Sequence, residues 1–355
     1  MTRPLSAQSG PSVPRWASVL PYPFRRIWQP EVCQGGHRRD DYFEGWYLKC
    51  VDASRSQVLA LIPGVSHDRA GNTSHSFVQV VRPGGQTAYV SYPIDAFTFD
   101  RRRFSITVGP NTFSESGVTL DLDGDGVRLT GDLGFGPWVP WPVSATKPGI
   151  MGPYRFVPRM EGYHGVCSLD HGLTGALELN GERLDFDGGR GYAEKDWGRS
   201  FPSSWVWAQS NHFDRPHISV TVSVARIPWM GSSFVGFIAG AWISGKLFRF
   251  TSYTGARLTA FQSRFDGATM TYEDHAFRLE VELDGAAAAP LKAPSHGRMV
   301  ARADESLDAS MRAKLTNLRT GEVILDDCGL HAGCEVMDVK GELAAGVWRP
   351  KSREE

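Results

Sequence analysis

Acidic and aromatic residues crowd together between positions 188 and 211. Glu194 and Asp196 lie two positions apart, and a segment with strand-like alternation follows from Trp205 to Asn211. Because side chains alternate along a strand, one face of this segment would carry Trp205, Trp207, Gln209 and Asn211. The sequence therefore predicts an aromatic wall that ends in amides, with two acids close to it.

A second segment, nearer the N-terminus, repeats the combination of an acid and a tryptophan. Glu44 and Trp46 would lie on one face of a strand that begins near Tyr42. A carboxylic acid removed from water has a raised pKa and can donate a proton, and the face of a tryptophan stabilises positive charge. Two such strands lining one apolar pocket would suit a reaction that passes through a carbocation. Glu44, Glu194 and Asp196 are the candidate acids.

The same residues also fit a purely structural role. Glu194-Lys195-Asp196 would then form a charged turn with Arg190 or Arg199, and the tryptophans would belong to the core. Aromatic residues dominate β cores and runs of charge are usually solvated, so the pattern alone favours this interpretation. An acid buried beside a ligand pocket would favour the catalytic interpretation instead.

Short apolar runs and period-two alternation characterise the chain from residue 42 onward. Turn-forming pairs such as Asn180-Gly181 and Asp284-Gly285 separate the runs. This pattern is typical of antiparallel strands joined by hairpins. The stretch from Asp121 to Gly126 superficially fits a calcium-binding loop, but apolar residues alternate on both sides of it, which indicates a hairpin turn. The predicted class is all-β.

Residues 133–160 differ from the rest because they combine prolines with Trp138, Trp141 and Tyr154. Such a segment cannot be regular helix or central strand, and its aromatic content indicates an ordered crossover. The predicted organisation is an N-terminal extension (1–30), two antiparallel β-barrel domains (31–145 and 146–345) joined by this Pro- and aromatic-rich crossover, and a C-terminal tail (346–355). Barrels of about eight strands can enclose one apolar ligand. We expect Tyr154 to help cap a binding cavity at the junction.

Composition and missing motifs exclude several classes of protein. Lysine and arginine total 38 against 39 aspartates and glutamates, so nucleic acid is not an expected partner. The chain has five cysteines and no secretory signal, which favours a reducing compartment, the cytoplasm. It also has no apolar run long enough to span a membrane, so any membrane contact is expected to be peripheral. P-loop, dinucleotide-binding and Gly-x-Ser-x-Gly motifs are lacking. Cys328, His331 and Cys334 lack an evident fourth ligand, so no metal is predicted.

Several motifs, in order along the chain, resemble those of the tocopherol cyclase family. They are Phe43-Glu44-Gly45-Trp46-Tyr47-Leu48-Lys49, Gly149 to Tyr154, Met160-Glu161 with His164-Gly165, and Glu194-Lys195-Asp196-Trp197-Gly198 with the Trp-x-Trp-x-Gln-x-Asn run that follows. The resemblance implies two lipocalin-like β-barrels, similar to carotenoid hydratases and some cycloaddition enzymes of polyketide pathways. It also implies closure of a chromanol ring on a prenylated benzoquinol. In that reaction a double bond is protonated and the phenolic oxygen captures the tertiary cation, without a redox cofactor.

This chemistry gives each candidate residue an expected role. Glu44, Glu194 or Asp196 would donate the proton. The tryptophans that would shield the cation are Trp46, Trp197, Trp205 and Trp207. Gln209 and Asn211 would orient the quinol hydroxyls. The expected partner is an apolar small molecule, and the alternative function is a lipid carrier of lipocalin type, because the same pocket would hold a prenyl or polyene ligand without catalysis.

Overall fold

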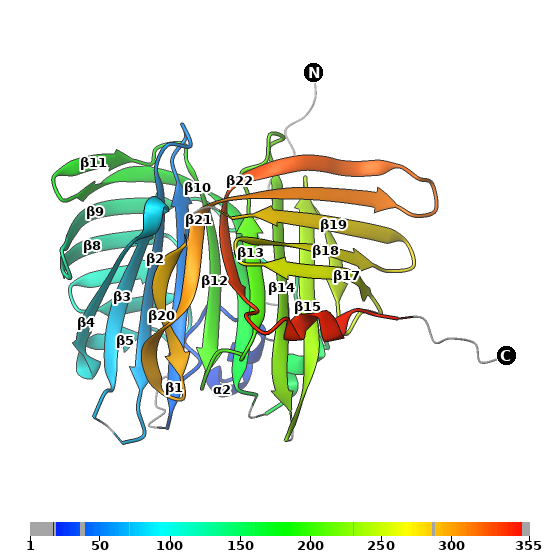
Figure 1. Cartoon of the computed structure of the whole chain (residues 1–355). Helices are drawn as coiled ribbons and strands as arrows, with labels where there is room; N and C mark the ends of the chain where they lie inside the picture. The colour runs from blue at the N-terminus through cyan, green and yellow to red at the C-terminus, as the bar shows by residue number, and fades with distance from the viewer. Residues whose placement is uncertain are drawn as a thin grey trace.

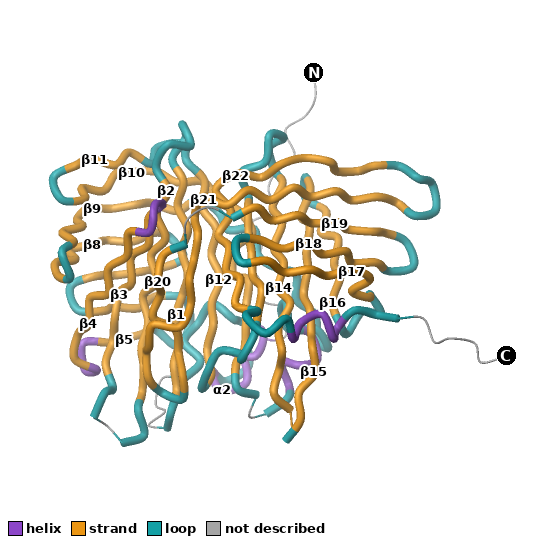
Figure 2. Tube along the Cα trace, viewed as in Figure 1, coloured by secondary structure: helices purple, strands orange, loops and turns teal. Residues whose placement is uncertain are grey.

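The protein consists of two antiparallel β-sheets set side by side, shown as a computed structural model in Figure 1. The structure describes residue 17 and residues 19–35, 40–70, 72–158, 160–229, 231–285 and 288–349. Strands make up most of these ranges, and short helical turns and loops connect them (Figure 2). The predicted all-β class is confirmed.

The first sheet has 12 strands and contains both the N-terminal strands and the middle of the chain. Its strand order is β4 (Gln86–Pro93), β3 (His75–Arg82), β2 (Val58–His67), β1 (Tyr42–Val51), β12 (Arg190–Gly198), β10 (Gly162–Leu179), β9 (Val127–Phe135), β8 (Gly117–Gly124), β7 (Asn111–Ser114), β6 (Ser105–Val108) and β5 (Phe97–Phe99), with β11 (Glu182–Asp185) paired to β10. Val90 of β4 and Ile106 of β6 belong to one buried core although their strands lie near opposite ends of this order. The sheet therefore curls back on itself around that core.

The second sheet has 10 strands and is built from the C-terminal part of the chain. Its strand order is β16 (Lys246–Thr251), β15 (Ser232–Ile243), β14 (Ile218–Trp229), β13 (Trp205–Ser210), β22 (Val323–Met337), β21 (Arg298–Asn317), β19 (Phe277–Asp284), β18 (Gly267–Glu273) and β17 (Arg257–Arg264), with β20 (Ala289–Ser295) paired to β21. Phe248 of β16 and Leu258 of β17, from its two edges, share one core, so this sheet curls as well.

Helical segments are short. The α-helix α2 covers Tyr22–Arg25, and the 3₁₀ turns are η1 (Arg26–Trp28), η2 (Pro83–Gly85), η3 (Ile94–Ala96), η4 (Gly152–Phe156) and η5 (Glu342–Gly346). Among the helices in the described ranges, none has the length and apolar character needed to cross a membrane.

Binary patterning explains the local structure of the strands, and β8 is a clear example. Val118, Leu120 and Leu122 are buried while the residues between them are exposed. The turn to β9 places Asp125 and Gly126 at φ 51° and 76°, which is the double positive φ of a type I′ hairpin. The aspartates and glycines of this segment therefore form a hairpin, as predicted.

The division between the two sheets differs from the predicted domain boundary. We expected the second domain to begin at residue 146, but β10, β11 and β12 belong to the first sheet, and the second sheet begins at Trp205. After the proline-rich crossover, β10 returns to pair with β9 and β12. The crossover nevertheless contacts the second sheet, because the ring of Trp141 lies against Gly240 of β15.

A third cluster of buried side chains lies between the two sheets. It includes Tyr47 of β1, Tyr192 of β12, and Trp205 and Trp207 of β13. Across this layer Lys49 of β1 donates to the backbone oxygen of Gln209 at 3.2 Å. The central strands of both sheets are thus held face to face, and their facing side chains surround the candidate site.

Candidate active site

A cavity of about 190 Å³ lies between the two sheets and receives side chains from both. We call it the central cavity. Most of its wall is apolar and includes Phe43, Ile62, Phe77, Phe201, Trp205, Trp207, Ile227 and Leu291. The acidic and basic side chains in this wall are His164, Glu194, Asp196, Glu305 and Glu335, together with Glu161 and Lys292. Buried acids in an apolar enclosure are the arrangement that raises carboxyl pKa values.

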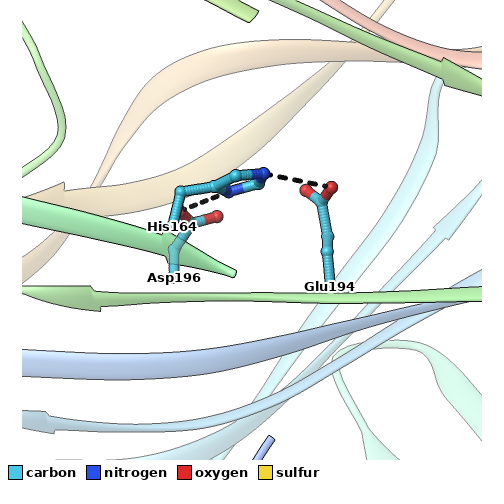
Figure 3. Close-up of side chains that lie close together, drawn as sticks. All are labelled: His164, Glu194 and Asp196. Atoms are coloured by element: carbon cyan, nitrogen blue, oxygen red, sulfur yellow. Dashed lines mark hydrogen bonds and ion pairs between the residues drawn. The ribbon is translucent and has the colours of Figure 1, made fainter. Parts of the chain in front are cut away.

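The first sheet contributes a histidine between two carboxylates (Figure 3). Glu194 and Asp196 lie on the same face of β12, and His164 of β10 is the cross-strand partner of Asp196. Nδ1 of His164 is 3.0 Å from Oδ1 of Asp196, and Nε2 is 3.6 Å from Oε2 of Glu194. Burial acts to lower the pKa of His164, but the charges of Asp196 and Glu194 outweigh it and raise this pKa to about 9. The imidazole is therefore a cation at neutral pH.

Glu194 is the buried carboxylate of this group. Its Oε2 accepts hydrogen bonds from the hydroxyl of Tyr192 at 2.6 Å and from Nε1 of Trp207 at 3.1 Å. Burial raises the pKa of Glu194 to about 7, although the positive charge of His164 opposes the rise. Glu194 can therefore exchange a proton near neutral pH, which is the property that a general acid or base needs.

The second sheet contributes two more acids from strands that pair directly. Glu305 of β21 is the register partner of Glu335 of β22. The hydroxyl of Tyr47 donates to Oε1 of Glu305, and Nε1 of Trp205 donates to Oε2 of Glu335, both at 2.5 Å. Oε2 of Glu305 is buried and has no hydrogen-bond partner in the described ranges. Burial raises the pKa of Glu305 to about 8 and that of Glu335 well above its usual range.

Glu44 lies on the opposite face of β1 from the cavity. Its carboxylate forms a fully buried ion pair with Nζ of Lys195 at 2.5 Å. It also accepts hydrogen bonds from the hydroxyl of Tyr42 and from the backbone amides of Gln34 and Gly35. The structure thus gives Glu44 a saturated set of partners away from the central cavity.

The remaining predicted site residues are distributed between several environments. Trp205 and Trp207 line the central cavity. Trp46 packs in the core of the first sheet. Trp197 is not part of the cavity wall, but its ring stacks on that of Tyr163, which is, with ring centroids 5.6 Å apart. Tyr154 packs against Phe234 rather than lining the cavity, where the crossover instead contributes Met151.

The two predicted amides lie deeper between the sheets. Gln209 is fully buried, and neither polar atom of its side chain has a partner in the part of the chain that the structure describes. Asn211 donates to Oδ1 of Asp170 and to the backbone oxygen of Gly191. Neither amide is part of the cavity wall. A ligand could therefore contact these amides with its hydroxyl groups only if it extended beyond the central cavity.

Among the acidic and basic residues of the cavity wall, Glu194 and Asp196 were predicted from the sequence, but not His164, Glu305 and Glu335, nor Glu161 and Lys292. A signal for Glu305 exists in the sequence, because it interrupts a row of apolar residues at alternate positions. Those residues are Ala303, Leu307, Ala309, Met311, Ala313 and Leu315. An acid in such a row must point into the core, where only a functional or paired role justifies its burial. The positions of His164 and Glu335 follow from cross-strand register, which the sequence does not reveal.

His164, Glu194 and Asp196 also offer ligand atoms for a cation. One atom from each lies within 4.8 Å of the other two. One imidazole and two carboxylates would suit a divalent transition metal. In the structure the same atoms satisfy one another, since the imidazole lies between the two carboxylates.

The fold and the site together define a two-sheet, all-β protein with proton-exchanging groups in an apolar cavity between the sheets. Residues 132–337, more than half of the chain, match the tocopherol cyclase-like family model. The chain belongs to the tocopherol cyclase-like family, as its motifs predicted.

Two plant proteins with similar sequences are named as tocopherol cyclases. The chain is 31% identical over 117 residues to "Probable tocopherol cyclase, chloroplastic" of Oryza sativa subsp. japonica, covering 32% of this chain and 25% of that protein. It is 27% identical over 190 residues to "Tocopherol cyclase, chloroplastic" of Zea mays, covering 50% of this chain and 40% of that protein. The alignments thus span less than half the length of either relative.

Among solved structures, the crystal structure of CghA with Sch210972 superposes with a TM-score of 0.53. The sequence identity is 12%, and the match covers 83% of this chain and 88% of CghA. A second structure, of CghA alone, gives a TM-score of 0.52 at 11% identity, over 87% of this chain and 90% of that one. These likenesses show the fold, and the predicted pair of lipocalin-like antiparallel β domains is confirmed at that level.

Proposed function

We propose that the protein is a cyclase that closes a ring on a prenylated quinol or a related prenyl or polyene lipid by acid catalysis. The observation that carries the proposal is the central cavity, in which Glu194 and Glu305 hold raised carboxyl pKa values among aromatic side chains. Membership of the tocopherol cyclase-like family supports the same class of reaction. The reaction is an isomerisation, so no atom is gained or lost.

Glu305 is the proposed proton donor. With a pKa of about 8 it carries a proton at neutral pH, and its unpartnered Oε2 leaves that proton without an acceptor in the described protein. Transfer to the double bond breaks the O–H bond, forms a C–H bond and leaves a tertiary cation. Tyr47, which donates to Oε1, would stabilise the resulting carboxylate, and the rings of Trp205 and Trp207 would shield the cation.

Glu194 is the proposed acceptor of the phenolic proton. The phenolic oxygen attacks the cation to form the C–O bond of the new ring, and its proton leaves to a base. Glu194 is ionised in part at neutral pH, and the neighbouring His164 cation stabilises its charge. Asp196 would then act on Glu194 through His164, by holding the imidazole in place at 3.0 Å. The proton returns from Glu194 to Glu305 through solvent after the product leaves.

Incubation with a phytyl-benzoquinol in heavy water tests this proposal. Protonation of the double bond must place one solvent deuterium on carbon, so mass analysis of the chromanol fraction should find a single non-exchangeable label. The control is the Asp304→Asn variant, which changes an exposed acid next to Glu305. A chromanol without the label, or formed equally without protein, would contradict enzymatic protonation.

A lipid carrier is the second candidate, and the apolar wall of the central cavity favours it. A carrier needs the aromatic enclosure but no proton-exchanging acid. Retention of the quinol by the protein without any labelled product, for this quinol and for polyene analogues, would favour this function over the cyclase.

The pH dependence of kcat/KM should be bell-shaped with a maximum between about 7 and 8. The donor Glu305 must be protonated, so the rate falls as pH rises through its pKa of about 8. The base Glu194 must be ionised, so the rate falls as pH drops through its pKa of about 7. Initial rates measured from pH 5.5 to 9.5 check this, and a rate that keeps rising towards high pH would exclude an acidic proton donor.

A further inference from the structure

A second cavity, beside the central one, is rich in arginine. It has a volume of about 720 Å³ and shares Met160 and Tyr163 with the wall of the central cavity. We call it the arginine cavity. The charged residues that line it are Arg26, Arg69, Arg155, Arg199, Asp40 and Asp41. Four cations thus face two anions, whereas the acids of the central cavity outnumber its cations.

Arg155 is a largely enclosed cation of the arginine cavity that forms no ion pair with a carboxylate in the described ranges. One of its nitrogens donates to Oε1 of Gln34 at 2.6 Å and to the backbone oxygen of Arg26 at 3.3 Å, which are neutral groups. Its Nε is buried and has no hydrogen-bond partner in the described ranges. The charge of Glu44 acts on Arg155, but that carboxylate is already paired with Lys195. By contrast, Arg199 pairs with Asp41 at 3.9 Å.

The Arg155 guanidinium is also held in a fixed orientation. It lies over the rings of Trp197 and Tyr163, 4.9 and 5.3 Å from their centroids. Burial lowers its pKa to about 10, so it remains charged at neutral pH. A desolvated cation that is oriented by ring faces and left without an anion is costly unless a ligand supplies the negative charge. The planar guanidinium fits carboxylate and phosphate oxygens particularly well.

We propose that the arginine cavity binds the oxyanion head group, a carboxylate or phosphate, of a ligand whose apolar part occupies the central cavity, with Arg155 as its anchor. Tyr163 and Met160, which line both cavities, mark where such a ligand would pass from one to the other. The two walls support this direction, because four arginines line the arginine cavity whereas most of the wall of the central cavity is apolar. The inference rests on the proposed function, because it narrows the substrate to those prenylated quinols, or related prenyl or polyene lipids, that also carry a carboxylate or phosphate.

Binding calorimetry with three probes tests this inference without any turnover. The probes are n-decyl phosphate below its micellar concentration, decanol, and inorganic phosphate. Decyl phosphate should bind the wild type at least about 10-fold more tightly than decanol, since a hydrogen bond to a charged group contributes that much or more. The Arg155→Gln variant should lose this preference. The control, Arg183→Gln, removes an exposed arginine of β11 outside both cavities and should keep it.

Two results would overturn the inference. One is an unchanged preference for decyl phosphate in Arg155→Gln. The other is inorganic phosphate binding as tightly as decyl phosphate, which would indicate a free anion site unconnected with the central cavity. Arg155→Lys keeps the positive charge but loses the planar guanidinium. Its preference for decyl phosphate over decanol should lie between those of the wild type and Arg155→Gln, which provides a readout if the glutamine variant does not fold. Because no turnover is measured, failure of the quinol to cyclise and failure of Arg155 to bind the head group are separate results.

Discussion

Turnover of the Glu305→Gln variant should fall by about 10²- to 10⁴-fold, the usual contribution of a positioned general acid. Glutamine keeps the shape of the side chain and can still accept the hydrogen bond from Tyr47, but it has no acidic proton to give. The free energy of unfolding should change little or rise, because a neutral amide replaces a carboxylate whose ionised form is disfavoured by burial. The measurement is single-turnover formation of the deuterium-labelled chromanol, with thermal unfolding of the same samples.

Glu194→Gln provides the comparison that assigns the two roles. It should also slow turnover, and it should remove the fall in rate at low pH, since that limb reports ionisation of Glu194. The control Asp304→Asn should match the wild type. If Glu305→Gln remains active while Glu194→Gln is inactive, Glu194 is the donor and the assignment to Glu305 is wrong. If both retain wild-type rates, acid catalysis by these residues is excluded.

Much of the fold could be predicted because strand patterning is local. In β8 the alternation of buried and exposed residues and the Asp125-Gly126 turn are both readable from neighbouring positions. The placement of β12 could not be read in this way. It pairs with β1, so that Tyr47 faces Glu194 across almost 150 positions of sequence, and no local pattern encodes such a partner. The misplaced boundary at residue 146 has this origin.

The candidate site was predictable only where one face of a strand differs from the other. Trp205 and Trp207 were placed correctly on one face of β13, and both line the central cavity. For β1 the two faces could not be distinguished, because both are buried. Trp46 and Tyr47 are neighbours on the strand and point in opposite directions, and both side chains are buried. Glu44 and Trp46 supply an acid and a large aromatic ring, so the sequence favoured their face of the strand as the site. The opposite face, which carries Tyr47, is the one that lines the central cavity.

Glu44→Gln should lower the free energy of unfolding by about 3–5 kcal/mol, the usual cost of removing one partner from a buried ion pair. Glu44 and Lys195 are both fully buried and 2.5 Å apart. Loss of the carboxylate charge leaves the Lys195 ammonium without its counter-charge. Within the described ranges it would then retain the backbone oxygen of Val32 and the faces of Trp46 and Trp197 as partners. Urea denaturation of the variant and the wild type measures the difference.

The double variant Glu44→Gln/Lys195→Met distinguishes this cause from a packing defect. Removal of the second charge should recover part of the lost stability, because a buried pair replaced by neutral groups is often close to neutral. Recovery should be incomplete, since the amides of Gln34 and Gly35 still need an acceptor that the glutamine satisfies less well than the carboxylate. A double variant no more stable than Glu44→Gln would contradict the ion-pair explanation.

Glu44→Gln should also retain activity, because Glu44 points away from the central cavity. We expect the folded fraction of this variant to turn over within about tenfold of the wild type. A loss of turnover as large as that of Glu305→Gln would restore Glu44 as a candidate proton donor.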